Sequence, residues 1–190
     1  NQIFPTLYNA FSVLLLGVFC GPVANGLFDA GTKLVDISQQ FLKIISRTFF
    51  PFLSRKIDKH TLFSKIYMLF TLIVTLGLIF FAPFLIPVFF SEEFSESIKV
   101  LRLMAISGVF LTMSNIYGTN YLIIIVRERS LRNLTMYASL LGFVIAIPLI
   151  YYGGYMGAVA IIVFVRMLLG VGSYLLAYNC KKNICKKNLL

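Results

Sequence analysis

The sequence predicts an all-α integral membrane protein with six transmembrane helices, and three observations carry this prediction. Hydrophobic residues make up 59% of the 190 residues and the mean hydropathy is +0.89, which is more apolar surface than a soluble domain of this size can bury. Six apolar stretches follow one another, separated by links of at most about a dozen residues. Basic residues gather in alternate links, as they do in multi-pass membrane proteins.

The predicted spans leave no room for a soluble domain, so residues 1–190 are interpreted as one transmembrane unit. The first span is slightly short of the ~20 residues that a bilayer crossing needs. Glycine-rich links at Gly21–Gly26 and Gly153–Gly157 are typical of tight turns. Pro83 and Pro87 are expected to kink or unwind the last turns of the third span. The six spans cover approximately residues 3–20, 26–52, 66–90, 98–126, 134–152 and 158–178.

The charges of the links predict the orientation. The links after the second and fourth spans and the C-terminal tail contain eleven Lys or Arg, whereas the other three links contain none. Because Lys and Arg concentrate in cytoplasmic loops, the N-terminal edge and the C-terminus are both expected in the cytoplasm. Membrane lipids with anionic headgroups are then the nearest partners of these cations, and the net charge of +10 does not indicate nucleic acid.

The second span carries the pattern that indicates a function. Its polar residues recur at intervals of four, three, four, three and four, so they share one face of a helix. Charged side chains at membrane depth cost about 2.5–3.5 kcal/mol each and normally face a bundle interior or a watery cavity. A polar face that runs the length of the membrane therefore favours a transporter. We call this set the polar face; its members are Asp29, Lys33, Asp36, Gln40, Lys43 and Arg47.

A purely structural interpretation of the polar face stays open. Asp29 and Asp36 are spaced for intrahelical ion pairs with Lys33, and such pairs lower the cost of insertion without any role in transport. Lys43 and Arg47 can extend toward the headgroups of the inner leaflet. If the face instead lines a cavity, these two cations favour a phosphate or pyrophosphate on the transported molecule.

Two further polar positions allow the same pair of interpretations. Arg166 is the single charge of the sixth span and lies close to the bilayer middle. It is either the structural partner of an acid such as Asp36 or Asp29, or part of a substrate site. Asn115 and Asn120 either form hydrogen bonds between helices or line a cavity.

The sequence gives little support for catalysis. His60 is the one histidine, and its place in a basic link indicates a surface residue. Cys20, Cys180 and Cys185 have no metal-binding or redox spacing. No nucleotide-binding loop or nucleophile motif is found. We therefore expect neither an enzyme nor a cofactor nor a metal site.

Four segments together match a known pattern. They are NGLFDAGTKLVDISQQF with the following RTFFPFLSR, then FFSEEFSESIKVLRLMA, SNIYGTNYLI and YYGGYMGAVAI. In this order they resemble bacterial polysaccharide flippases of the O-antigen type, within the multidrug/oligosaccharidyl-lipid/polysaccharide exporter superfamily. Each motif is weak alone, but their order and spacing are fairly specific and cover nearly all of the chain.

The resemblance implies a MATE-like transporter of two six-helix lobes. This chain would be the C-terminal lobe, the N-terminal lobe would be absent from it, and the start without Met agrees. The implied activity is flipping of an undecaprenyl-pyrophosphate-linked oligosaccharide across the bacterial inner membrane, by alternating access, for lipopolysaccharide O-antigen or capsule. Implied partners are this lipid-linked oligosaccharide, the N-terminal lobe, and the polysaccharide polymerase and chain-length machinery of the cell envelope.

The resemblance also implies roles for individual residues. Lys33, Lys43, Arg47 and Arg166, with Gln40, would line the central cavity and meet the pyrophosphate or acidic sugars.

The two acids of the polar face depart from a uniformly cationic cavity. Asp29 and Asp36 make its outer half nearly neutral and leave room for ion coupling. They keep open an alternative, a cation-coupled small-molecule or multidrug exporter of the same superfamily. A membrane-embedded glycan polymerase fits less well, because such enzymes tend to have a large outside loop and the outside links here are short.

Overall fold

A computed structural model of the chain describes residues 3–55, 59–125 and 128–187, with side chains from residue 10 to residue 181 in these ranges. The described part is almost entirely helical and contains no strand. Its elements are α1 (Ile3–Arg55), α2 (His60–Phe90), the 3₁₀ helix η2 (Glu92–Phe94), α3 (Ser97–Met113), the π-helix η3 (Ser114–Leu122) and α4 (Glu128–Lys187).

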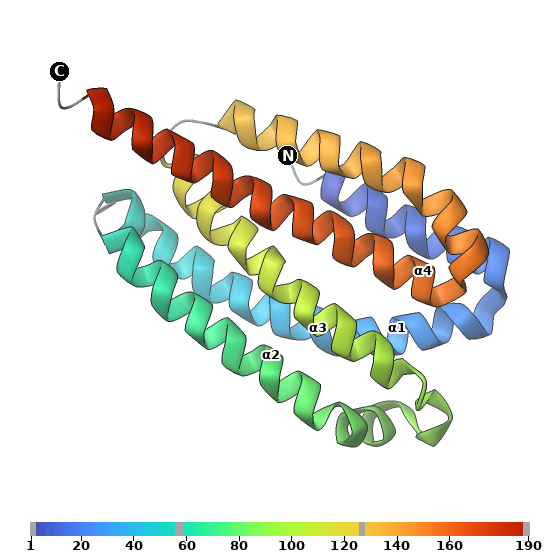
Figure 1. Cartoon of the computed structure of the whole chain (residues 1–190). Coiled ribbons are helices and arrows are strands. Elements are labelled where there is room, and N and C mark those ends of the chain that lie inside the picture. Colours follow the sequence, from blue (N-terminus) through green and yellow to red (C-terminus); the bar gives the residue numbers. More distant parts are fainter. Residues whose placement is uncertain (1–2, 56–58, 126–127, 188–190) are drawn as a thin grey trace.

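The two longest helices are each bent at a glycine. Gly21 in α1 has φ 80° and ψ 179°, and Gly154 in α4 has φ 56° and ψ −139°. Such positive φ values are easily adopted by glycine and rarely by other residues. Each helix turns back on itself at this residue, and both bends lie at the same end of the bundle as η2 (Figure 1). A hydrogen bond of 3.9 Å from Cys20 Sγ to the Ile150 carbonyl joins the two bends.

The two glycine-rich links are shorter turns in the structure than the sequence predicts. Six-residue and five-residue turns were expected at Gly21–Gly26 and Gly153–Gly157, but in each link one glycine alone leaves the helical conformation. Pro22 then occupies the start of the second half of α1, where its missing N–H group leaves no hydrogen bond unmade. The helices continue because a single glycine is enough to reverse the chain.

Within the described residues, four helices are long and apolar enough to cross a membrane, which indicates a multi-pass membrane protein. They are Ala10–Arg55, His60–Phe90, Ser97–Leu122 and Glu128–Lys181. Large apolar side chains cover the outside of the bundle, as hydrocarbon-facing surfaces require; Phe80 is 77% exposed and Phe84 is 65% exposed.

The third and fourth predicted spans differ from the structure in detail. α2 begins earlier than expected, at His60, and stays helical through Pro83 and Pro87 to Phe90. Of the two effects expected of these prolines, a kink or unwinding, the last turns show no unwinding. The fourth span is not one regular helix, because α3 passes into the π-helix η3. The wider turn is visible in the hydrogen bond of 3.3 Å from the Ile123 N–H to the Gly118 carbonyl, five residues back.

The core lies where α3 packs between the two bent helices. Leu101 and Met104 of α3 are buried against Val35 of α1 and Val165 of α4. Close contact is possible because Gly170 of α4 faces the α3 backbone; a Cβ there would lie 2.5 Å from the Phe110 carbonyl oxygen. Small residues at crossing points are typical of helices that pack in a membrane.

Candidate functional site

The polar face of α1 lies at the surface of the bundle. Lys43 is half-buried and the other five members are exposed, so they do not point into the core of this chain. The apolar residues beside them on the helix are exposed as well: Ile37 is 56% and Phe41 is 57% exposed. No other element within the described part of this chain covers the polar face.

One member of the polar face has a partner on another helix. The Asp36 carboxylate lies 3.7 Å from the guanidinium of Arg166 on α4, and within the described residues no other ion pair is closer than 4.0 Å. The Arg166 side chain is 5% exposed, whereas that of Asp36 is 51% exposed. A second guanidinium nitrogen donates a hydrogen bond of 3.0 Å to Ser107 Oγ on α3. Arg166 therefore connects α1, α3 and α4 from a buried position.

This placement bears on the two interpretations of Arg166. Pairing with Asp36 is the structural alternative, and it accounts for a charge in the middle of an apolar helix. The Nε atom of Arg166 has no hydrogen-bond partner. Ser107, which the sequence patterns did not connect with Arg166, donates its own proton to the Met104 carbonyl at 2.7 Å and so remains an acceptor for the guanidinium.

The rest of the polar face has no such anchor. The ion pairs of Lys33 with Asp29 and Asp36, which the structural interpretation offered, are not formed in the described structure, where the nearest opposite charge to Asp36 is Arg166. With Asp36 neutralised, Lys43 and Arg47 leave the half of the face near the end of α1 cationic. Gln40 lies between the two halves and is exposed.

We call the end of the bundle where Lys43 and Arg47 lie, near the C-terminal end of α1, the basic end. Hydrogen bonds between helices stabilise it. Asn120 of η3 donates a bond of 2.8 Å to Ser46 Oγ of α1, and both residues are buried. The Tyr67 hydroxyl of α2 donates a bond of 2.7 Å to the Leu42 carbonyl. Asn120 thus joins helices, which is the first of the two interpretations offered for it.

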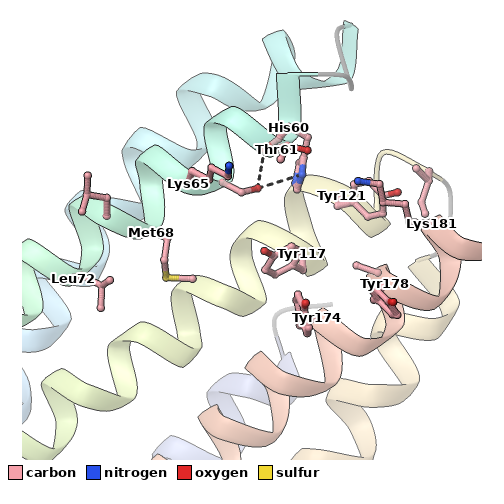
Figure 2. A pocket seen from close by; sticks show the side chains of 14 residues that line it. His60, Thr61, Lys65, Met68, Leu72, Tyr117, Tyr121, Tyr174, Tyr178 and Lys181 are labelled. Carbon is pink, nitrogen blue, oxygen red and sulfur yellow. Dashed lines mark hydrogen bonds between the residues drawn. The ribbon is translucent and has the colours of Figure 1, made fainter.

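A cavity of about 870 Å³ opens at the basic end of the bundle, between α2, η3 and the last turns of α4 (Figure 2). Its walls combine lysines, tyrosines and one histidine with aliphatic side chains, and no residue of the polar face contributes. The lining residues are His60, Thr61, Ser64, Lys65, Met68, Leu69, Leu72, Tyr117, Tyr121, Ile125, Tyr174, Ala177, Tyr178 and Lys181.

The interpretation of His60 as a surface residue is wrong, because this residue is only 7% exposed. Its Nε2 lies 3.1 Å from the Ile116 carbonyl of η3. A carbonyl can only accept, so Nε2 carries the proton of this hydrogen bond. Ser64 Oγ lies 3.2 Å from Nδ1 and donates to the His60 carbonyl at 2.7 Å (Figure 2).

A signal for the buried face of α2, from which His60 and Ser64 reach the cavity, was present in the sequence. The buried polar residues of α2 recur at intervals of four, three, four and four, which is helical spacing on one face. The high hydropathy of the third span concealed this pattern. The residues are His60, Ser64, Tyr67, Thr71 and Thr75.

Comparison with known proteins shows similarity to a protein that is named as a transporter. The chain is 29% identical over 170 residues to a protein of Shigella dysenteriae named "Putative O-antigen transporter", and the alignment covers 86% of this chain and 43% of that protein. The chain thus spans less than half the length of this relative. No family model and no solved structure matches. The likeness supports the O-antigen flippase type of family that the sequence motifs resemble, and the relative's name is that of a transporter and not of an enzyme.

Proposed function

We propose that this chain forms one lobe of a flippase that moves a polyprenyl-pyrophosphate-linked oligosaccharide from the inner to the outer leaflet of the bacterial inner membrane. The observation that carries the proposal is the polar face of α1, which is exposed along a helix that is otherwise apolar. A relative named as an O-antigen transporter supports the substrate class.

In this proposal the two bent helices each cross the bilayer twice. α1 has 53 residues and would span about 80 Å if it were straight, far more than the hydrocarbon thickness of about 30 Å. α4 has 60 residues and presents the same excess. Bends at Gly21 and Gly154 divide each helix into two segments, and each segment is long enough to cross the bilayer. The chain would therefore cross six times, with its basic end in the cytoplasm.

The polar face would form one wall of the translocation route, and a second lobe would supply the other. Exposed charges in the membrane are stable only beside water or polar partners. Lys43 and Arg47 lie at the basic end, where the pyrophosphate would enter, and both can donate hydrogen bonds to phosphate oxygens. Lys33 and Gln40 would follow them toward the outer side. Asp36 is paired with Arg166 and would therefore not act as a free acid in the translocation route.

The proposal is tested by complementing a deletion strain. The variant K43A/R47A is expected to restore less than about a tenth of the surface polysaccharide, because two phosphate donors are lost from the route. The variant K99A/R102A is the matched control, since it also removes one Lys and one Arg, both exposed but carried by α3 and not by the polar face of α1. Equal rescue by the two variants at equal membrane abundance would remove the polar face from the route. Altered drug or cation tolerance with normal surface polysaccharide in the deletion strain would favour the exporter alternative.

A further inference from the structure

We propose that the cavity between α2, η3 and the end of α4 is a binding site for one anionic phospholipid of the surrounding leaflet. This site is separate from the translocation route, and the inference does not depend on the proposed substrate. It rests on the charges at the mouth of the cavity, the order of polar and apolar residues along its walls, and the aromatic floor.

The mouth of the cavity is cationic. Lys65 of α2 and Lys181 of α4 lie on opposite walls, at the end where His60 is found (Figure 2). Both lysines are exposed, and the described residues that line the cavity include no acid. Two ammonium groups that face one space favour an anionic group between them, and basic pockets between transmembrane helices are typical sites for lipid phosphates.

The wall formed by α2 changes from polar to apolar with distance from the mouth. On α2 the lining begins with His60 and Lys65 and continues with Met68, Leu69 and Leu72. Leu72 is seven residues beyond Lys65, about 10 Å further along the helix. This is the order of a lipid molecule itself, with a charged headgroup at the interface and an acyl chain below. A free phosphate would use only the mouth and leave the apolar wall without a partner.

Contacts between aromatic side chains of the protein itself form the floor of the cavity, so this surface does not depend on a ligand. Tyr117 of η3 meets Tyr174 of α4 edge to face, with ring centroids 5.0 Å apart. His60 packs against Tyr121 at a centroid distance of 5.0 Å and is held by its hydrogen bond to Ile116. Tyrosines are favoured at membrane interfaces because the ring is apolar and the hydroxyl is polar. A volume of about 870 Å³ is within the usual range for a ligand site.

A tryptophan reporter tests the proposal in the complete polypeptide. These 190 residues contain no Trp, and Leu69 lines the cavity while being 61% exposed, so L69W places an indole at the site. Fluorescence of L69W minus that of the unsubstituted protein is measured in nanodiscs with acyl-brominated phosphatidylglycerol or with phosphatidylethanolamine that carries the same chains. Phosphatidylglycerol should half-quench the indole at a mole fraction roughly 10-fold lower. Equal quenching by the two lipids would overturn the proposal.

Charge variants in the L69W background assign the effect to the two lysines. K65A/K181A should remove the preference for phosphatidylglycerol, whereas K65R/K181R should keep it because the charges remain. R55A/K59A is the matched control, since these two cations are exposed at the same end but do not line the cavity. Loss of the preference in R55A/K59A as well, or its persistence in K65A/K181A, would contradict a site at this position.

A competition arm separates a resident phospholipid from the transported lipid. Unbrominated undecaprenyl pyrophosphate is titrated into L69W nanodiscs that hold brominated phosphatidylglycerol. We expect it to relieve quenching no better, per negative charge, than unbrominated phosphatidylglycerol does. Relief at a mole fraction ten or more times lower would overturn the proposal and assign the cavity to the polyprenyl substrate.

Discussion

Arg166 and Asp36 form an ion pair of 3.7 Å in which one partner is buried and the other half-exposed, with 5% and 51% of the side chains accessible. The pair joins the last long helix to the polar face of α1. Because the two partners differ so much in exposure, removing one of them should not cost the same stability as removing the other.

We expect D36N to destabilise the protein more than R166M. D36N leaves a buried guanidinium without its carboxylate and with a hydrogen bond to Ser107, and an uncompensated buried charge costs about 3–5 kcal/mol. R166M leaves a half-exposed carboxylate that water can reach, so its cost should be about 1–2 kcal/mol by the same reasoning. Thermal unfolding of both variants in detergent checks the order. The reverse order would show that Arg166 is not held mainly by Asp36.

A second prediction concerns the contact of α1 with η3. Asn120 and Ser46 are both buried and joined by a hydrogen bond of 2.8 Å. In a double-mutant cycle of N120A and S46A, the coupling energy should be about 0.6 kcal/mol, the typical value for a hydrogen bond between membrane helices. Additive losses would mean that the two side chains do not interact in the membrane.

A pair of glycine variants tests the packing of α3 on α4. G170A should cost about 1–3 kcal/mol, because the new methyl group meets the Phe110 backbone, which cannot rotate away as a side chain can. G77A is the control: a Cβ at Gly77 meets nothing within 4 Å, so this variant should be neutral or slightly stabilised. Apparent melting temperatures of the two variants provide the comparison. Equal behaviour would mean that α3 and α4 do not approach each other closely at Gly170.

The helices and the polar face were predictable because both depend on short-range order. Hydropathy marks the apolar helices, and the spacing of Asp29 to Arg47 depends only on the turn of one helix. Arg166 was found as an unusual intramembrane charge, and its pairing with Asp36 was one of two alternatives. These features require no knowledge of how the helices pack.

The remaining features arise from contacts between distant segments. The burial of His60 depends on Ile116, fifty-six residues away, so no local pattern contains it. The π-helix at Ser114–Leu122 is more polar than α3 before it, but a polar composition does not by itself distinguish a π-helix from an α-helix. The cavity needs α2, η3 and α4 together. Whether a glycine link becomes a long turn or a single bend, as at Gly21, is likewise decided by packing.

The leaflet in which the lipid-linked oligosaccharide accumulates in the absence of the protein tests the proposed flippase activity most directly. In a deletion strain, radiolabelled repeat units on the polyprenyl carrier are probed in sealed inner-membrane vesicles of known orientation with a glycosidase that cannot cross the bilayer. We expect complete repeat units to be digested only in inside-out vesicles, where the cytoplasmic face is exposed, and complementation to restore digestion in right-side-out vesicles. Complete units on the outer face of the deletion strain, with normal surface polysaccharide, would contradict a flippase.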